Sequence, residues 1–309
     1  MEILDFSNIN HINFPSIITI GMFDGVHIGH QQLLNDLTNK AKQTNAKSVV
    51  ISFKNHPRLV LEKNCNTNKV ELLQTNEQRF NKIAKMNIDY LLLIEFSNDF
   101  SHLTPKQFLD ILIEKLNPKI LLLGYDNHFG NPNNSEFKEI LSNGCYKTLK
   151  IEQEKQAIYY NSIEVSSTEI RKALKRGDIC LANTMLNENY SICSTVVNGQ
   201  KIGRTIGFPT ANISIPENII LPKDGVYAVR VEIDDTTYNG ITNIGFRPTF
   251  NGKNRTIETF IFSFVKNIYN KKIKISFFNF LREEQRFDNK ELLKQQIQQD
   301  YEKANQILS

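Results

Sequence analysis

The stretch Gly21-Met22-Phe23-Asp24-Gly25-Val26-His27-Ile28-Gly29-His30 joins a predicted strand, Ile17–Met22, to a predicted helix, Gln31–Lys42. Its glycines allow the backbone to approach a ligand closely at this turn. The helix that follows offers free N–H groups and the positive end of its dipole, both of which suit a phosphate. His27 and His30 are three residues apart, so on a first helical turn they share a face and can donate hydrogen bonds to phosphate oxygens. The stretch therefore predicts a phosphate-binding turn in an α/β domain.

Two other interpretations of this turn were weighed. The even spacing of Gly21, Gly25 and Gly29 does not match the G-x-G-x-x-G fingerprint of dinucleotide-binding folds. A zinc site is an alternative for a His-x-x-His pair, but no cysteine lies near it in the sequence and there is no HExxH motif. Because the pair sits in a strand–turn–helix context with Asp24 and the glycines, we favour phosphate chemistry.

The first half of the chain alternates between β-rich and helical patterns. The further strands expected here are Ser48–Phe53, Tyr90–Ile94 and Ile120–Gly124, and the further helices are Asn76–Lys85, Pro105–Leu116 and Ser167–Lys175. Thr104 is a good N-cap for the helix that begins at Pro105. This alternation predicts a Rossmann-like parallel sheet with helices on both faces.

The second half has a different pattern, in which short β-rich runs are separated by turn residues. The expected strands are Ser194–Val197, Val226–Ile233, Thr236–Ile241, Thr256–Phe264 and Ile273–Phe278, followed by a helix from Asn289 to Ile307. This pattern predicts a small antiparallel barrel or sandwich with a C-terminal helix. We place the domain boundary between residues 183 and 184, which gives domains 1–183 and 184–309.

Composition narrows the class of protein. The chain has 309 residues, of which 40% are hydrophobic and 23% charged, and this length favours two domains. The net charge of +4 comes from 37 basic and 33 acidic residues, and neither half is basic enough to favour nucleic-acid binding. The N-terminus does not resemble a signal peptide, no run of about 18 apolar residues occurs, and no cysteines form a CxxC pair. We therefore expect a cytoplasmic protein that binds no membrane.

Two further segments carry candidate anion contacts. Ser166-Ser167-Thr168-Glu169-Ile170-Arg171 places hydroxyls at a helix start with an arginine one turn later, which suits phosphate, although a plain Ser/Thr N-cap is the alternative. Asp126 follows the strand Ile120–Gly124, at the end of the sheet where open α/β folds contact their ligands.

The strongest signal in the second half is Gly203-Arg204-Thr205-Ile206-Gly207-Phe208-Pro209-Thr210-Ala211-Asn212. A basic loop flanked by glycines can cover phosphates, and the neutral oxygens of Thr210 and Asn212 suit a Mg²⁺ ion that bridges them. The alternative is a β-turn that contains a proline. All six histidines of the chain lie in the first half. Proton transfer in the second half must therefore use a carboxylate, Lys, Tyr, Cys or water.

The first-half motifs resemble those of a known family. The turn at residues 21–30 resembles the HxGH signature of the nucleotidyltransferase superfamily, and its wider form GxFDGxHxGH is similar to that of the bacterial bifunctional riboflavin kinase/FAD synthetases. The strand-end segment 52–57 resembles the family's FxxHP, the segment 124–130 its GxDFxFG, and the segment 166–171 the superfamily's SSTxIR. The second half continues the resemblance: 203–212 is similar to GRxxGFPTAN, and segments 225–227, 243–250, 257–260 and 281–287 match in the same order.

The resemblance implies a fold, an activity and a set of site residues. It implies that MgATP phosphorylates riboflavin to FMN in the C-terminal domain, and that a second ATP adenylylates FMN to FAD in the N-terminal domain, with release of pyrophosphate. By resemblance, the catalytic residues are His27, His30 and the general base Glu258. The residues that resemble ATP contacts in adenylyl transfer are Gly21, Phe23, Asp24, Gly25, Gly29, Ser167, Thr168 and Arg171, and those that resemble flavin contacts are Asn55, His56, Asp126, Arg282 and Glu284. The residues that resemble kinase ATP contacts are Gly203, Arg204, Gly207 and Pro209, and the implied Mg²⁺ ligands are Thr210 and Asn212. FMN and FAD are the product ligands, and we expect a monomer or a weak homo-oligomer.

Three departures from the family pattern keep other interpretations open. Residues 129–136 contain no Lys or Arg where the family has basic residues, Phe260 stands where the family has His, and residues 186–190 lack a usual Gly and Arg. One alternative is a riboflavin kinase whose adenylyltransferase activity is weakened or lost. A second is a flavin-binding regulator without catalysis. A third, an HxGH enzyme acting on a nicotinate or pantetheine phosphate, leaves the second half of the chain unexplained.

Overall fold

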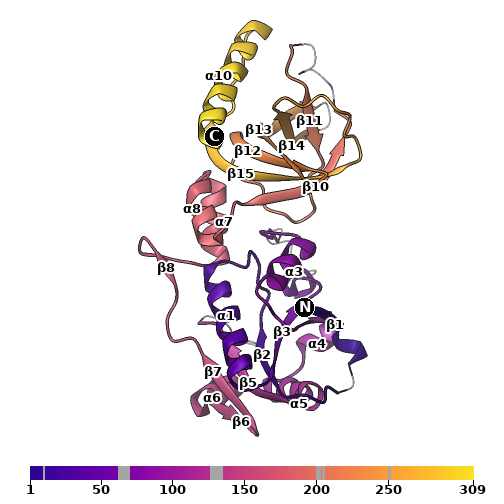
Figure 1. Ribbon diagram of the computed structural model, residues 1–309, viewed down its shortest axis with the longest axis vertical. Helices are drawn as coiled ribbons and strands as arrows, with labels where there is room; N and C mark the ends of the chain where they lie inside the picture. The colour runs from indigo at the N-terminus through magenta and orange to yellow at the C-terminus, as the bar shows by residue number, and fades with distance from the viewer. Residues whose placement is uncertain (10, 62–69, 126–134, 200–202, 204–205, 250–251) are drawn as a thin grey trace. The chain divides into compact units, whose positions relative to one another are not determined.

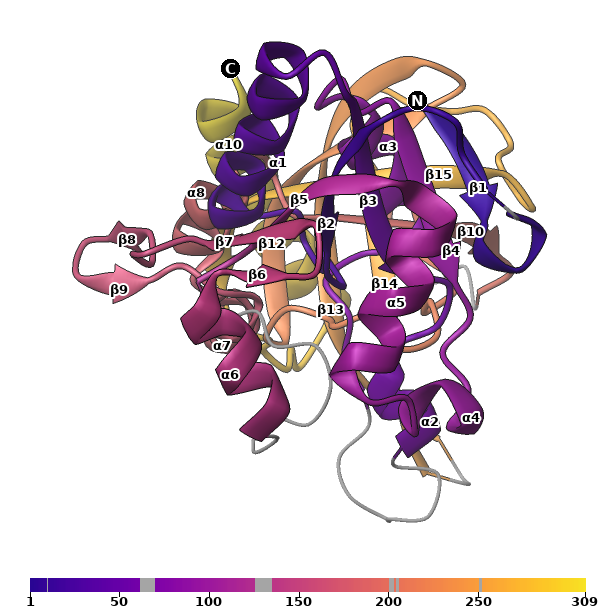
Figure 2. The same cartoon turned by 90° about the horizontal axis from the view of Figure 1, so that it is seen from below.

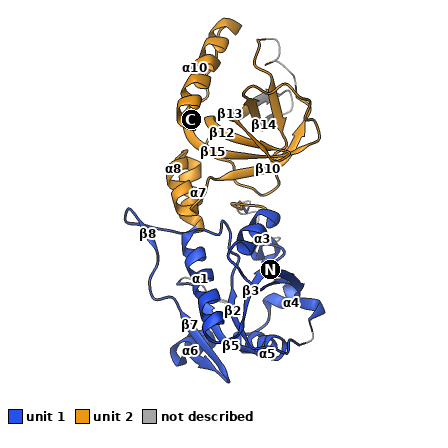
Figure 3. Ribbon diagram, in the orientation of Figure 1, with its two compact units in different colours: residues 1–70, 76–166 blue, residues 71–75, 167–309 orange. Residues whose placement is uncertain are grey.

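A computed structural model describes the chain except for residues 10, 62–69, 126–134, 200–202, 204–205 and 250–251, and except for the side chains of residues 247–254. The chain divides into two compact units, of which the first contains residues 1–70 and 76–166 and the second contains residues 71–75 and 167–309 (Figure 3). The boundary between residues 183 and 184 stays a prediction; it falls inside helix α8 (Ile179–Leu186).

The first unit is built on a seven-stranded sheet in the order β1-β4-β3-β2-β5-β7-β6 (Figure 1). Its strands are β1 Glu2–Asp5, β2 Ser16–Ile20, β3 Lys47–Phe53, β4 Tyr90–Ile94, β5 Pro118–Leu123, β6 Cys145–Tyr146 and β7 Leu149–Gln153. Neighbouring strands from β1 to β7 are parallel, and β6 pairs antiparallel with β7. The predicted parallel sheet is confirmed. The carboxyl ends of β2 and β3 meet at one edge, where the segments 21–27 and 54–57 begin.

Helices cover both faces of this sheet, as the alternating pattern predicts. The helical elements are η1 Phe6–Asn8, α1 Ile28–Gln43, α2 Pro57–Leu61, α3 Asn76–Ala84, α4 Asn98–Ser101, α5 Pro105–Leu116 and α6 Ser135–Asn143, and the hairpin β8 Tyr159–Tyr160 with β9 Ile163–Glu164 follows. Helices α1 and α3 lie on one face of the sheet, and α5 and α6 lie on the other (Figure 2). The first pair buries apolar side chains such as Leu34 and Ile83, and the second pair buries Leu112 and Ile140. The predicted N-cap Thr104 is confirmed, since it forms a reciprocal capping box with Gln107 at the start of α5.

The second unit contains a closed barrel in the order β10-β11-β14-β13-β12-β15. Its elements are α7 Ser167–Arg176, α8 Ile179–Leu186, β10 Ser191–Val197, β11 Thr210–Ile213, β12 Gly225–Ile233, β13 Thr236–Thr249, β14 Gly252–Ile261, β15 Lys272–Arg282 and α10 Lys290–Leu308. Of the two predicted architectures, the barrel is therefore the one that forms, and full closure leaves no exposed sheet edge.

Helix α10 packs against the barrel through an apolar cluster. Ala304 and Leu308 of α10 pack with Val226, Ile241 and Leu281 from the strands. This contact makes α10 a fixed part of the barrel wall rather than a free tail. In the part of the chain that the structure describes, every helix is too short or too polar to cross a membrane.

Candidate active sites

The turn after β2 has an unusual backbone. Phe23 and Val26 have φ angles of 51° and 45°, and Gly25 has a φ of 88°. Left-handed φ angles are strained for a branched or aromatic residue, and such strain persists only where the surroundings hold it. Both side chains are buried, with Phe23 2% exposed and Val26 1% exposed, and the Val26 N–H donates to the Phe23 carbonyl at 3.1 Å. Burial of these two side chains thus fixes the path of the turn.

The glycines of this turn allow close packing of rings. A Cβ on Gly21 would lie 3.2 Å from the Phe23 ring, and a Cβ on Gly29 would lie 3.2 Å from the His27 ring. Both values are tighter than ordinary contact, so a larger residue would push these rings aside. The glycines therefore position Phe23 and His27 as well as leaving room for a ligand.

The two histidines are brought together as predicted. Their ring centroids are 3.7 Å apart with an interplanar angle of 21°. One detail of the prediction is wrong: α1 begins at Ile28, so His27 is its N-cap rather than a residue of the first turn, and its Nδ1 accepts the His30 backbone N–H at 3.4 Å. The arrangement satisfies one free amide at the helix start.

The protonation of His30 follows from its surroundings. Burial lowers the pKa of the His30 imidazole well below its ordinary value, and the nearby charge of His27 lowers this pKa further. His30 is therefore neutral at pH 7. Its Nδ1 atom is buried and has no hydrogen-bond partner among the described residues. A neutral imidazole with one unpaired ring nitrogen can donate or accept a hydrogen bond when a ligand arrives.

The loop after β3 carries the predicted flavin contacts Asn55 and His56. The Asn55 amide donates to the Phe96 carbonyl at 2.9 Å and its oxygen accepts the Phe96 N–H at 2.8 Å. The His56 Nδ1 accepts the Arg58 N–H at 3.1 Å. Both side chains thus shape the loop itself, and their flavin contacts stay a prediction. Asp126 lies outside the described residues.

Sequence analysis missed two cations on α3 that contact the turn. Arg79, which is 3% exposed, donates to the Met22 carbonyl at 2.7 Å, and Lys82 donates to the Gly25 carbonyl at 3.0 Å. Burial lowers the pKa of Arg79 to about 10, and the charge of Asp24 partly offsets this. The only local signal was the presence of three basic residues, Arg79, Lys82 and Lys85, spaced three apart on the predicted helix 76–85.

The remaining predicted phosphate contacts of the adenylyl site begin α7 in the second unit. Ser167 is the first residue of this helix and Thr168 the second, as the sequence predicts. The Arg171 Nε donates to the Glu71 carbonyl at 2.6 Å, which ties α7 to the short segment 71–75 of the same unit. Phosphate binding by these residues stays a prediction.

The barrel contains a cavity of about 360 Å³, the size class of small-molecule sites. Its apolar lining includes Phe208, Ile241, Phe260, Phe287 and Ile297, and its polar lining includes Gly203, Thr210, Asn243, Glu258, Arg282, Glu284 and Asp300. The predicted residues Gly203, Thr210, Glu258, Arg282 and Glu284, which are far apart in the sequence, are thus brought to one cavity. Asn212 pairs with Glu258 across β11 and β14, which places the predicted metal ligand opposite the predicted base.

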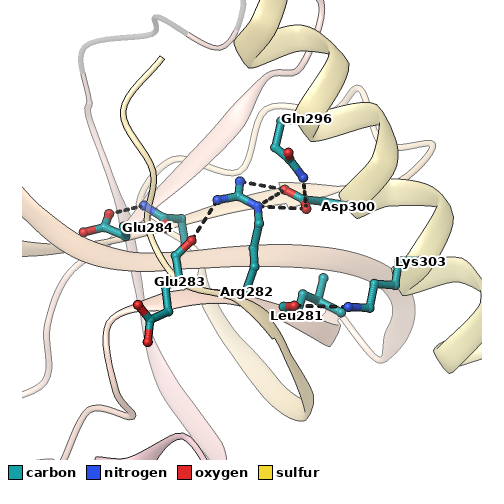
Figure 4. A network of polar contacts seen from close by, with 8 residues as sticks. Leu281, Arg282, Glu283, Glu284, Gln296, Asp300 and Lys303 are labelled. Carbon is teal, nitrogen blue, oxygen red and sulfur yellow. Dashed lines mark hydrogen bonds and ion pairs between the residues drawn. The ribbon is translucent and has the colours of Figure 1, made fainter.

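Ion pairs fix the wall of this cavity that β15 and α10 form (Figure 4). The Arg282 guanidinium donates to both carboxylate oxygens of Asp300 at 2.8–3.0 Å, and Gln296 donates to the same carboxylate at 3.1 Å. The pair is largely buried, since the Arg282 and Asp300 side chains are 17% and 5% exposed. A paired, bidentate guanidinium is held in one orientation. Arg282 can therefore present a rigid planar surface to a bound ring.

Two glycines pack closely against residues that line this cavity or lie beside it. Glu284 accepts a hydrogen bond from the Asn243 amide at 2.9 Å, and a Cβ on Gly245 would lie 1.8 Å from the Glu284 carboxylate. A Cβ on Gly203 would lie 2.2 Å from the Phe208 carbonyl. A side chain at position 203 would clash with backbone, whereas one at position 245 would require the Glu284 carboxylate to move. Of the predicted kinase ATP contacts, Gly207 has a φ of 89° and Arg204 lies outside the described residues.

A second hollow of about 400 Å³ opens on the barrel. Its lining includes Pro209, Thr210, Thr259, Ile261, Phe264 and Tyr269. Thr210 lines both hollows, so a molecule in each could meet at this residue. Pro209, the remaining predicted kinase ATP contact, lies in this second hollow.

Comparisons with known proteins match the two halves of the chain to two families. A sequence model of the FAD synthetase family matches residues 9–169, and a model of the riboflavin kinase family matches residues 186–308. Proteins named bifunctional riboflavin kinase/FMN adenylyltransferase are similar over almost their full length. The protein from Buchnera aphidicola subsp. Schizaphis graminum is 38% identical, and the match covers 96% of this chain and 95% of that protein. The protein from Bacillus subtilis is 35% identical, with 95% of this chain and 93% of that protein covered. The protein from Escherichia coli K12 is 32% identical, with 92% of this chain and 90% of that protein covered.

The fold is also shared with a solved structure. A crystal structure of a macrolide-efflux protein from Streptococcus pneumoniae superimposes with a TM-score of 0.87 and 28% identity, and the match covers 99% of both chains. The word efflux describes that protein in its name and is not carried over to this chain. The similarity concerns the fold of the two chains.

Proposed function

This chain belongs to the bifunctional riboflavin kinase/FMN adenylyltransferase family, and on that premise we propose that it makes FAD from riboflavin in two ATP-dependent steps. The barrel unit phosphorylates riboflavin to FMN. The α/β unit transfers AMP from a second ATP to FMN and releases pyrophosphate. The observation that carries this proposal is that both family matches lie in order on one chain and together cover residues 9–169 and 186–308.

In the kinase step, we assign the barrel cavity to riboflavin and the base to Glu258. Glu258 takes the proton of the ribityl 5′-hydroxyl, the oxygen attacks the γ-phosphorus of ATP, and the bond to ADP breaks. The cavity has an apolar lining for the isoalloxazine ring and lies beside Thr210. The second hollow, which shares Thr210, suits the adenosine of ATP. A carboxylate base agrees with the absence of histidine from the second half of the sequence.

Mg²⁺ is part of the proposal for this step. Thr210 and Asn212 are two residues apart on β11, so their side chains lie on one face of the strand, and Asn212 pairs with Glu258. Hard oxygen ligands on one face next to the base fit a Mg²⁺ ion that also binds phosphates. When bound, this ion neutralises phosphate charge during transfer.

In the adenylyl step, a phosphate oxygen of FMN attacks the α-phosphorus of ATP and pyrophosphate leaves. We assign the free amides at the start of α1 and the imidazoles of His27 and His30 to the phosphates. The neutral His30 imidazole can stabilise developing charge by donating a hydrogen bond, and the proposal includes no covalent intermediate on it. We also assign Ser167, Thr168 and Arg171 to these phosphates, on the resemblance of residues 166–171 to the SSTxIR segment.

The remaining assignments are coarser. We propose that the enzyme works in the cytoplasm, as a monomer or a weak homo-oligomer, with the domain boundary between residues 183 and 184.

A kinase with weakened adenylyltransferase activity is the second candidate, since residues 129–136 carry no Lys or Arg. Phe260, which packs edge to face on Phe208 at 5.2 Å, lines the kinase cavity and leaves Glu258 in place.

One assay tests the proposal. Purified protein is incubated with riboflavin and MgATP, and the flavins are separated by chromatography over time. We expect FMN first and FAD after it. FMN without FAD would support the second candidate, and formation of neither flavin would contradict the proposed function and leave a flavin-binding regulator.

A further inference from the structure

Helix α3 contacts the two loops of the adenylyl site through Arg79. One terminal nitrogen of its guanidinium donates to the Met22 carbonyl at 2.7 Å, and the other donates to the Phe53 carbonyl and, at 2.9 Å, to the Asn76 side-chain oxygen. Met22 begins the phosphate-binding turn, and Phe53 is the last residue of β3 before the loop that carries His56. A single planar fork therefore joins the backbones of both loops.

Neighbouring side chains on α3 reinforce this contact. The Asn76 amide donates to the Lys54 carbonyl at 2.6 Å, and the Lys82 ammonium donates to the Gly25 carbonyl at 3.0 Å. Together with Arg79, α3 holds four carbonyls, two from each loop. In a trans peptide the C=O and the next N–H point to opposite sides. With the Met22 carbonyl held toward α3, the Phe23 N–H is directed away from α3, which orients an amide of the turn.

Charge and burial distinguish Arg79 from an ordinary surface cation. Arg79 is 3% exposed and Asp24 in the turn is 5% exposed. The Arg79 Nε is buried with no hydrogen-bond partner among the described residues, an arrangement that costs stability. A buried carboxylate in a phosphate-binding turn would repel ATP. The attraction between Arg79 and Asp24 offsets that repulsion, which gives the buried cation a use beyond folding.

We propose that Arg79 is a positioning residue for adenylyl transfer, which holds the ATP-binding turn and the loop after β3 in one geometry and balances the charge of Asp24. Arg79 acts through the backbone of Met22 and Phe53 and does not touch the reacting atoms. The inference rests on the proposed function of the first unit.

The test compares R79Q and R79K with the wild type in the full-length chain. The rate of FAD formation from FMN and MgATP is measured with the concentration of each substrate varied. Because loop misplacement of about 1 Å can cost a hundredfold in rate, we expect R79Q to lower kcat/KM for ATP by about that factor. R79K keeps the charge but not the fork, so we expect a loss of about tenfold, with KM raised more than kcat is lowered.

Two controls are built into the chain. Riboflavin phosphorylation by the same variants is expected to stay within about twofold of wild type, since the barrel belongs to the other compact unit. Lys85, which is exposed just beyond α3, serves as the matched substitution, and K85Q is expected to leave both activities unchanged. Calorimetry gives the fraction of the first unit that is folded at the assay temperature.

The outcomes separate the hypotheses. Wild-type kcat/KM for ATP in both R79Q and R79K would overturn the inference, and so would a loss that merely equals the unfolded fraction. A folded R79K with a raised KM for ATP and normal kinase activity would support it. Absence of FAD formation from FMN by the wild-type protein would contradict the proposed function itself.

Discussion

The turn after β2 and the barrel cavity are built from different kinds of chemical group. In the turn, backbone curvature at Phe23 and Val26 and two stacked imidazole rings form the site, and the buried Asp24 carboxylate attracts the Arg79 guanidinium. In the barrel, side-chain carboxylates and one anchored guanidinium line a cavity of about 360 Å³. Under the proposed function, we expect the first site to stabilise charge that develops on phosphates and the second to activate a hydroxyl and hold a ring.

This difference teaches which changes each site tolerates. A site built from backbone depends on glycines and on the side chains that contact the turn. Small displacements of the turn are therefore enough to lower its activity. A site built from side chains fails when one functional group is removed. We therefore expect a substitution in one unit to lower the activity of that unit and to leave the activity of the other unit unchanged.

Removal of the barrel's base gives the largest expected effect. Glu258→Gln keeps the shape of the side chain but removes the proton acceptor, so riboflavin phosphorylation should fall by about a thousandfold. Adenylylation of added FMN should stay unchanged. Rates from flavin chromatography with each substrate check this, and a residual kinase rate within tenfold of wild type would show that Glu258 is not the base.

In the turn, His30→Ala removes one neutral donor next to the phosphates. Loss of one such donor is expected to slow FAD formation from FMN by about a hundredfold, since preorganised donors contribute on this scale. Riboflavin phosphorylation should be unaffected. If both rates fall together, the separation of the two sites is wrong.

Substitution in the cavity wall should have a smaller effect. Asp300→Asn leaves Arg282 without its charged partner, so we expect the KM for riboflavin to rise by about tenfold and the barrel to lose about 3 kcal/mol of stability. Glu302→Gln removes the same charge from an exposed position of α10 and is the matched control. Steady-state kinetics and calorimetry give both values; an unchanged KM would mean that Arg282 does not contact the ring.

The smallest effect concerns pH. The pKa of His30 is lowered in the folded state, so the unfolded chain binds the proton more readily. Stability of the first unit should therefore fall as pH drops below about 6.5, the ordinary histidine value. Melting curves between about pH 7 and pH 5 should show this slope, and His30→Ala should flatten it.

Sequence alone predicted elements with strong local signals. Helix α5 begins at the predicted cap Thr104, strand β4 has the predicted bounds Tyr90–Ile94, and the closed barrel is one of two expected architectures. The histidine pair and some of the residues that line the barrel cavity, namely Gly203, Thr210, Glu258, Arg282 and Glu284, were also found from motifs. These features depend on neighbours in the chain or on complete motifs.

Features that depend on distant contacts were missed. Strand β1, Glu2–Asp5, is four residues long and forms through its pairing with β4, which no local pattern reveals. Arg79 contacts a carbonyl 57 positions away, and Asp300 pairs with Arg282 only because α10 packs on β15. Partners such as these are set by packing, so they become visible only in the folded chain.

Mixing two variants, each impaired in one of the two reactions, tests most directly that each unit carries out its own reaction. Glu258→Gln and His30→Ala are combined in one tube with riboflavin and MgATP, and flavins are followed by chromatography. The account predicts almost no product from Glu258→Gln alone, FMN from His30→Ala alone, and FAD from the mixture, because FMN released by one variant is adenylylated by the other. A mixture that accumulates FMN without FAD would contradict it.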